Sequence, residues 1–112
     1  MMRDILKIEK ALKDLARQRK LVTLGRFFKI VHLRRNDSNE KEMILVLSLI
    51  NDNLYQKYDI VICSLILKDD KYAPIDMFID YMIEEEKMKE EESIGIFWII
   101  EIEKCFAYYD KI

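Results

Sequence analysis

The stretch "LVTLGRFFKIVHLRRNDSNEKEMILVLSLI" (residues 21–50) fits two different architectures, a β-hairpin or a helix-turn-helix. Residues 21–34 and 43–50 are rich in Phe, Ile, Val and Leu, which are the residue types enriched in strands. The polar segment "NDSNEKE" between them is typical of a turn. Because the first half also contains almost none of the strongest helix formers, this pattern predicts a β-hairpin.

A helix is the alternative interpretation of residues 21–34. Thr23 is a good N-cap residue, and a helix beginning there would give a helix-turn-helix with the preceding segment. Four apolar residues fall at helical spacing: Leu24, Phe27, Phe28 and Val31. We favour the hairpin over this helix.

Two flanking segments have a clear helical period. Residues 3–18 place Ile5, Ile8, Leu12 and Leu15 on one side, and residues 74–91 repeat the pattern with Pro74 suited to the first helical position. The acidic continuation "EEEKMKEEE" (residues 84–92) has few apolar positions. It is expected to extend the second helix into solvent or onto a partner.

The remaining apolar runs predict strands. "YDIVICSLIL" (residues 58–67) is almost entirely apolar, which is typical of a central strand covered on both faces. Residues 94–104 end in an alternation of Ile and Glu. The expected fold is therefore α/β (α+β), with one compact domain over residues 1–112, the order α-β-β-β-α-β, and a mainly antiparallel sheet with two packed helices.

Charge is distributed very unevenly. Residues 1–35 contain 11 Lys and Arg against 3 Asp and Glu, whereas residues 36–112 contain 8 against 18. A concentrated cationic surface favours nucleic acid, because binding releases the counterions of the phosphates. The candidate nucleic-acid-binding residues are Lys13, Arg17, Arg19, Lys20, Arg26, Lys29, Arg34 and Arg35. Phe27 or Phe28 would add base stacking.

The chain itself offers an alternative use for these cations. They can be neutralised by its later acids, in the same molecule or in a second copy. The acidic helix at residues 84–92 can equally present a negative face to a basic protein partner, as an interaction or inhibitor module. The candidate protein-interaction residues are Glu84, Glu85, Glu90, Glu91, Glu92, Phe106, Tyr108 and Tyr109.

Few residues are available for catalysis, so we expect a binding protein without enzymatic activity. His32 is the only histidine, and no nucleophile motif lies near it. Gly25 and Gly95 stand alone, which excludes a glycine-rich phosphate loop. The pattern indicates no cofactor and no metal.

The α-β-β-β-α-β order is similar to the core of the PD-(D/E)xK nuclease superfamily. This resemblance implies a metal-dependent nuclease as a further alternative. The acids that the sequence offers for a magnesium site are Asp59, Asp69 and Asp70, and Glu101 with Glu103. The chain departs from the family motif, because "DIVICSLILK" contains no Glu-x-Lys and "EIEK" has the wrong spacing.

Several features of the sequence favour a cytoplasmic homodimer. The N-terminus has no secretory signal pattern, and the longest apolar run, "IGIFWII", is too short to span a bilayer. Cys63 and Cys105 lie in apolar segments and are expected to be buried thiols, which suits a cytoplasmic protein without membrane contact. Trp98 is expected in the core, and the terminal aromatic residues favour a homodimer.

Overall fold

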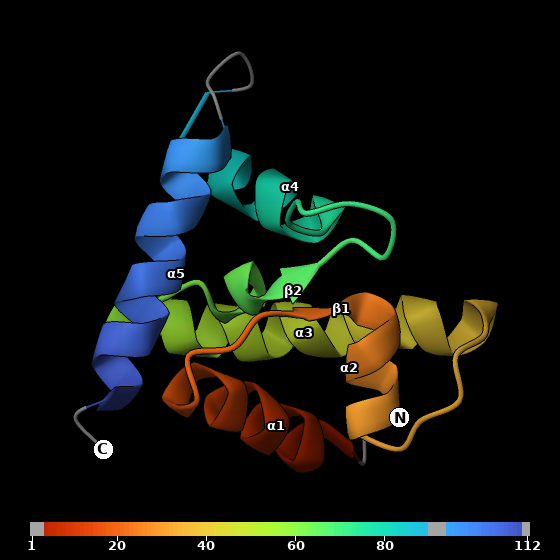
Figure 1. Cartoon of the computed structure of the whole chain (residues 1–112). Helices are drawn as coiled ribbons and strands as arrows, with labels where there is room; N and C mark the ends of the chain where they lie inside the picture. The colour runs from red at the N-terminus through yellow and green to blue at the C-terminus, as the bar shows by residue number, and fades with distance from the viewer. Residues whose placement is uncertain (1–3, 90–93, 111–112) are drawn as a thin grey trace.

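The computed structural model describes residues 4–89 and 94–110, and every long element in this part of the chain is an α-helix (Figure 1). Two short strands pair in parallel, with Val22 opposite Ile66 and Thr23 opposite Leu67. The predicted α/β class with a mainly antiparallel sheet is therefore wrong, since the fold is mainly helical. The elements are α1 (Ile5–Arg17), β1 (Val22–Thr23), α2 (Leu24–Ile30), α3 (Asp37–Tyr58), the 3-10 helix η2 (Ile62–Leu65), β2 (Ile66–Leu67), α4 (Asp76–Glu84) and α5 (Ile94–Asp110).

The predicted hairpin is replaced by α2 and α3, and capping explains why. The Thr23 hydroxyl oxygen accepts a hydrogen bond from the backbone N–H of Arg26 at 3.2 Å, so the helical alternative for residues 21–34 is correct. The Asn36 side chain accepts from the N–H of Asn39 at 2.8 Å. The polar segment between the apolar runs therefore begins a helix instead of reversing a strand.

The predicted strands at residues 43–50 and 94–104 lie within α3 and α5. Both helices bury residues at the same relative positions, 0, 3, 4, 7, 8 and 11, which is one continuous helical stripe. Burial along this stripe outweighs the strand preference of the individual Ile and Val residues. The buried residues are Met43, Val46, Leu47, Ile50, Asn51 and Leu54 in α3, and Trp98, Glu101, Ile102, Cys105, Phe106 and Tyr109 in α5.

The apolar run at residues 58–67 lies at the centre of the molecule, but only its last two residues form a strand. Residues 60–67 are all buried, and η2 contacts α1, α3, α4 and α5. The indole N–H of Trp98 donates to the Ser64 carbonyl oxygen at 2.8 Å. The predicted central position of this run and the core position of Trp98 are thus confirmed.

The two predicted amphipathic helices are confirmed as α1 and α4, although α4 begins at Asp76 and not at Pro74, and residues 85–89 of the acidic extension are not helical. The helix ends at Glu84, and Glu86 has a left-handed φ of 57°. Met88, four residues after the end of the helix, is buried in the core. Glu90, Glu91 and Glu92 lie outside the described residues.

The helices surround the strand pair on several sides (Figure 1). In this view α5 and α2 lie on opposite sides of β1 and β2, α1 and α4 lie below and above them, and α3 crosses behind. The sheet core on which the nuclease resemblance depended is absent from the described residues. Within the same residues, no helix has the length and apolar character needed to cross a membrane.

Candidate nucleic-acid interface

A groove of about 500 Å³ runs along α2, and we call it the α2 groove. Phe27 and Phe28 are buried and fix the helix on the core, so Arg26 and Lys29, three positions apart, point outward on one face. Three of the predicted nucleic-acid-binding residues therefore line a single surface. The groove is lined by Thr23, Gly25, Arg26, Phe28, Lys29, Leu33 and Arg35.

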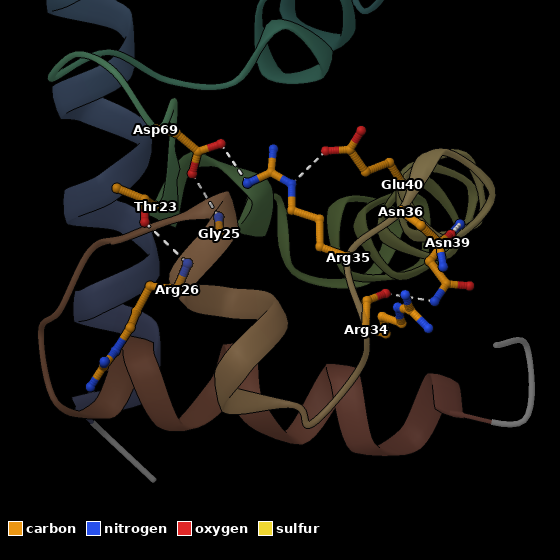
Figure 2. A network of polar contacts seen from close by, with 9 residues as sticks. All are labelled: Thr23, Gly25, Arg26, Arg34, Arg35, Asn36, Asn39, Glu40 and Asp69. Atoms are coloured by element: carbon orange, nitrogen blue, oxygen red, sulfur yellow. Dashed lines mark hydrogen bonds and ion pairs between the residues drawn. The ribbon is translucent and has the colours of Figure 1, made fainter.

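Arg26 and Lys29 are exposed cations without an acid partner among residues 4–89 and 94–110. Figure 2 shows the Arg26 side chain extending away from the neighbouring network of ion pairs. Lys20, in the turn before β1, and Arg34, just after α2, are also exposed and form no ion pair with a described residue. These four cations are available to an external anion.

Arg35 also lines the α2 groove, but it already forms ion pairs with two acids of the same chain. Its Nε lies 2.6 Å from a carboxylate oxygen of Glu40, and its Nη1 lies 2.6 Å from one of Asp69 (Figure 2). The hydrogen bond to Glu40, followed by that to Asp69, raises the pKa of Arg35. The guanidinium is therefore fixed at the edge of the groove between two acids.

Gly25 allows Asp69 to approach the backbone of α2. The Gly25 N–H donates to Asp69 at 2.8 Å, and a Cβ at this position would lie only 2.9 Å from the same oxygen. Partial desolvation acts to raise the pKa of Asp69, but the Gly25 N–H and the Arg35 guanidinium together hold it below its usual value. The contact ties α2 to the segment that follows β2.

Arg35 also borders an acidic cleft of about 600 Å³ on its other side. This cleft contains Asp70, Asp76 and Asp80 in addition to Asp69, and only Lys68 adds a second cation. Lys68 pairs with Asp76 at 2.8 Å. An anionic ligand is consequently attracted to the α2 side of Arg35 and repelled from the cleft side.

The other predicted cations lie elsewhere and are matched by acids of the same chain. Lys13 pairs with Glu9 at 2.7 Å within α1, and Arg17 lies 3.3 Å from Asp14. Arg19 pairs with Asp110 at the end of α5. The eight predicted residues thus do not share one surface.

Aromatic stacking is not available where the sequence suggested it. Phe27 and Phe28 are 0% and 1% exposed, because both point from α2 into the core. The Arg35 guanidinium lies over the Phe28 ring at 5.9 Å from the centroid. The α2 groove therefore offers charge rather than a platform for bases.

The predicted protein-interaction residues are also divided. Glu84 and Glu85 are exposed at the C-terminal end of α4. Phe106 and Tyr109 belong to the buried stripe of α5, while Tyr108 is half-buried and its ring lies 4.7 Å from that of Tyr58. Among the described members of this set, only the two glutamates are fully accessible.

Sequence reasoning missed a group of four charges that we call the charge cluster: Asp59, Lys87, Glu101 and Lys104. Lys104 lies 3.0 Å from Asp59 and 3.7 Å from Glu101, and Lys87 lies 3.5 Å and 3.6 Å from the same two acids. Glu101 is 3% exposed. Its position inside the buried stripe of α5 is the signal that could have revealed the cluster.

The four members of the charge cluster pair with one another. The hydrogen bond from Lys104 is the main reason that the pKa of Asp59 lies below its usual value. No group of His, Cys, Asp and Glu side chains in the described part of the chain could hold a metal ion. The cluster therefore joins the end of α3 to α5 and to the turn after α4.

The thiols and the histidine are poorly suited to covalent chemistry. Cys63 and Cys105 are free and buried, as predicted. Burial raises the pKa of both thiols, that of Cys105 to about 12, so neither is a thiolate at neutral pH. His32 is exposed at the end of α2 with a φ of 57°, where it closes the helix.

No protein-family model, no curated protein and no solved structure matches this chain.

Proposed function

We propose that this protein binds nucleic acid through the α2 groove, by contacts to the phosphate backbone. The observation that carries the proposal is that Arg26 and Lys29 line one groove and have no acid partner among the described residues. Lys20 and Arg34 supply two more exposed cations near the ends of the same segment. Displacement of phosphate counterions by such cations favours binding without any base contact.

The proposed ligand is a duplex rather than an unpaired strand. Single-strand binding surfaces combine cations with exposed aromatic rings, and both phenylalanines of α2 are buried. Contacts to phosphates position a protein on a duplex but do not select a sequence. We therefore expect weak, sequence-independent and strongly salt-dependent affinity.

Binding of a fluorescein-labelled 20-base-pair DNA duplex, followed by fluorescence anisotropy at 50 mM NaCl, tests the proposal. The double variant Arg26→Ala/Lys29→Ala is expected to bind at least about tenfold more weakly, because two phosphate contacts are lost. The matched control, Lys13→Ala/Arg17→Ala, also removes one Lys and one Arg, but these are already paired with Glu9 and Asp14. It should bind within about twofold of the native chain.

Two results would contradict the proposal. Either the native chain fails to bind the duplex, or both double variants weaken binding equally. Circular dichroism should show unchanged helix content in both variants, because all four side chains are exposed or half-buried.

The end of α4 supports a second candidate, recognition of a basic protein partner. Glu84, Glu85 and Glu86 are exposed at a helix C-terminus, where negative charge is unfavourable, and they form no ion pair within the described residues. A cationic partner would relieve this repulsion. The double variant Glu84→Lys/Glu85→Lys should abolish binding of a basic partner, but it should leave duplex affinity unchanged or raise it. Arg26→Ala/Lys29→Ala should instead weaken duplex binding, so these two double variants separate the two candidates.

We further propose an intracellular, cytoplasmic location. Both cysteines are free and buried, which suits a reducing compartment.

A further inference from the structure

Helix α5 is apolar on its outer side as well as on its buried stripe. Ile96, Ile99 and Ile100 are 65%, 60% and 49% exposed and follow one another at helical spacing. Glu103 and Ala107 continue the same line, and we call these five residues the α5 outer face. A helix that is apolar on both sides is typical of one that is covered on both sides.

The apolar surface continues beyond the helix into a neighbouring groove of about 500 Å³. Leu21, Leu67 and Phe106 line it, together with Ile99 of the outer face. Tyr72 is 76% exposed at its edge, with its ring 5.4 Å from that of Trp98. The exposed isoleucines thus belong to a larger apolar surface with a hollow beside it.

We infer that the α5 outer face joins two copies of this chain in a two-fold homodimer. Two-fold symmetry places the same surface of both molecules together, so the surface must complement itself in shape and charge. Antiparallel packing of the two α5 helices brings the isoleucines of one copy against those of the other. The hollow beside the helix can receive Ile99 of the second copy.

Charge at the groove identifies a second copy as the occupant. Its lining includes one anion, Glu103, and one cation, Arg19. Glu103 is exposed and has no ion pair with a described residue, and Arg19 is half exposed although it contacts Asp110. In a two-fold pair each Glu103 can approach Arg19 of the other copy. A partner with only positive charge would be attracted by Glu103 but repelled by Arg19, whereas a second copy presents both signs.

This interface differs from the one expected from the terminal aromatic residues. Phe106 and Tyr109 are largely inside the molecule, whereas the isoleucines of the preceding turns are outside. Helices α5 and α2 lie on opposite sides of the strand pair (Figure 1). A dimer formed through α5 therefore leaves the α2 groove of each copy open, and it does not depend on what that groove binds.

Sedimentation equilibrium of the full chain over the micromolar range tests the dimer. The native chain is expected to approach twice the mass of a single chain. Ile99→Glu should raise the dimer dissociation constant at least about tenfold, because it places a charge in the apolar centre of the interface. Leu45→Glu is the matched control, because Leu45 is 63% exposed on α3, and it should leave the constant within about twofold.

A charge exchange distinguishes contact across copies from a general loss of affinity. Glu103→Arg should weaken the dimer, and adding Arg19→Glu should restore part of the affinity. A native chain that stays monomeric overturns the inference, as does a dimer that persists in Ile99→Glu or is lost in Leu45→Glu. If Ile99→Glu loses helix content, the milder Ile96→Gln is measured instead, and an unchanged dissociation constant for it is equally contrary.

Discussion

Arg26 and Lys29 in the α2 groove have no acid partner in the described chain, whereas Lys87 and Lys104 in the charge cluster each contact both Asp59 and Glu101. The difference arises from burial. A carboxylate that is taken out of water needs a cation at a fixed place, so its lysines are committed to the fold. The cations on α2 remain hydrated and can exchange their counterions for phosphate.

Removing Lys104 is expected to have the largest effect on stability. Lys104→Met leaves the buried Glu101 carboxylate with one cation instead of two, and it should lower the free energy of unfolding by about 1–3 kcal/mol. Urea denaturation measures the loss. Lys57→Met, which removes an exposed lysine near the end of α3, should change stability by no more than about 0.5 kcal/mol. Equal losses in the two variants would show that the cluster is not a stabilising element.

Gly25→Ala disturbs the groove where it is attached to the core. The new Cβ would lie 2.9 Å from an oxygen of Asp69 and 3.0 Å from Nη1 of Arg35, so both side chains must shift and their hydrogen bonds weaken. Alanine is the better helix former by about 0.5–1 kcal/mol, which offsets part of this cost, so we expect a net loss of up to about 1 kcal/mol in the free energy of unfolding. In an Asp69→Ala background the same substitution should cost clearly less, because the closest contact is gone. An identical cost in both backgrounds would contradict this account of Gly25.

Asp69→Asn removes one of the two acids that hold Arg35 at the edge of the α2 groove, and Glu40 remains. The folded-state pKa of Asp69 lies below its unfolded value, so its carboxylate stabilises the fold above about pH 4, and the contribution is lost as the pH falls through the folded-state pKa. The variant should be less stable at pH 7 by up to about 1 kcal/mol, with a smaller difference at pH 2. Urea denaturation at both pH values measures this trend.

The same Asp69→Asn variant should bind the DNA duplex about twofold to fivefold more tightly, because an anion beside the α2 groove has been removed. Anisotropy titration at pH 7 gives the affinity. Asp80→Asn, at a more distant position of the acidic cleft on α4, is the matched control and should have a smaller effect. Weaker binding by Asp69→Asn would argue against a role for Arg35 in the groove.

His32→Gly is expected to have the smallest effect, and in the stabilising direction. Four of the described helices end in a non-glycine residue with left-handed φ, at Arg19, His32, Asp59 and Glu86. Glycine adopts this conformation without steric strain, although it also makes the unfolded chain more flexible. His32→Gly should therefore stabilise the fold by up to about 1 kcal/mol in thermal or urea unfolding. A destabilised variant would imply that the imidazole makes a contact of its own.

The sequence predicted the helices whose apolar period is accompanied by many good helix formers, and it failed where composition and period disagreed. In α1 both properties favour a helix. In α3 and α5 the stripe of six buried positions is helical, but Ile, Val and Phe favour strands locally. Burial of the stripe decided the outcome, and this long-range contribution is not contained in local preferences.

For the candidate nucleic-acid interface, the sequence indicated which cations to consider, but not which of them share one exposed surface. Arg26, Lys29 and Arg35 belong to one groove, as their closeness in sequence suggested. Arg19 is instead matched by Asp110, which is 91 positions away, and Arg35 by Asp69. These two pairings depend on how α2 and α5 pack, so no local pattern reveals them, whereas the pairs Lys13–Glu9 and Arg17–Asp14 lie at helical spacing within α1.

The salt dependence of duplex binding is the clearest test of whether the unpaired cations of α2, and not the paired cations of α1, bind phosphate. The logarithm of the association constant should fall linearly with the logarithm of the salt concentration, with a slope of about −2 to −4 for the native chain. Arg26→Ala/Lys29→Ala should reduce the magnitude of the slope by about 2, since each phosphate contact contributes about 0.9, and Lys13→Ala/Arg17→Ala should leave it unchanged. Equal slopes in all three proteins, or a loss confined to the second variant, would contradict the assignment of phosphate binding to the cations of α2.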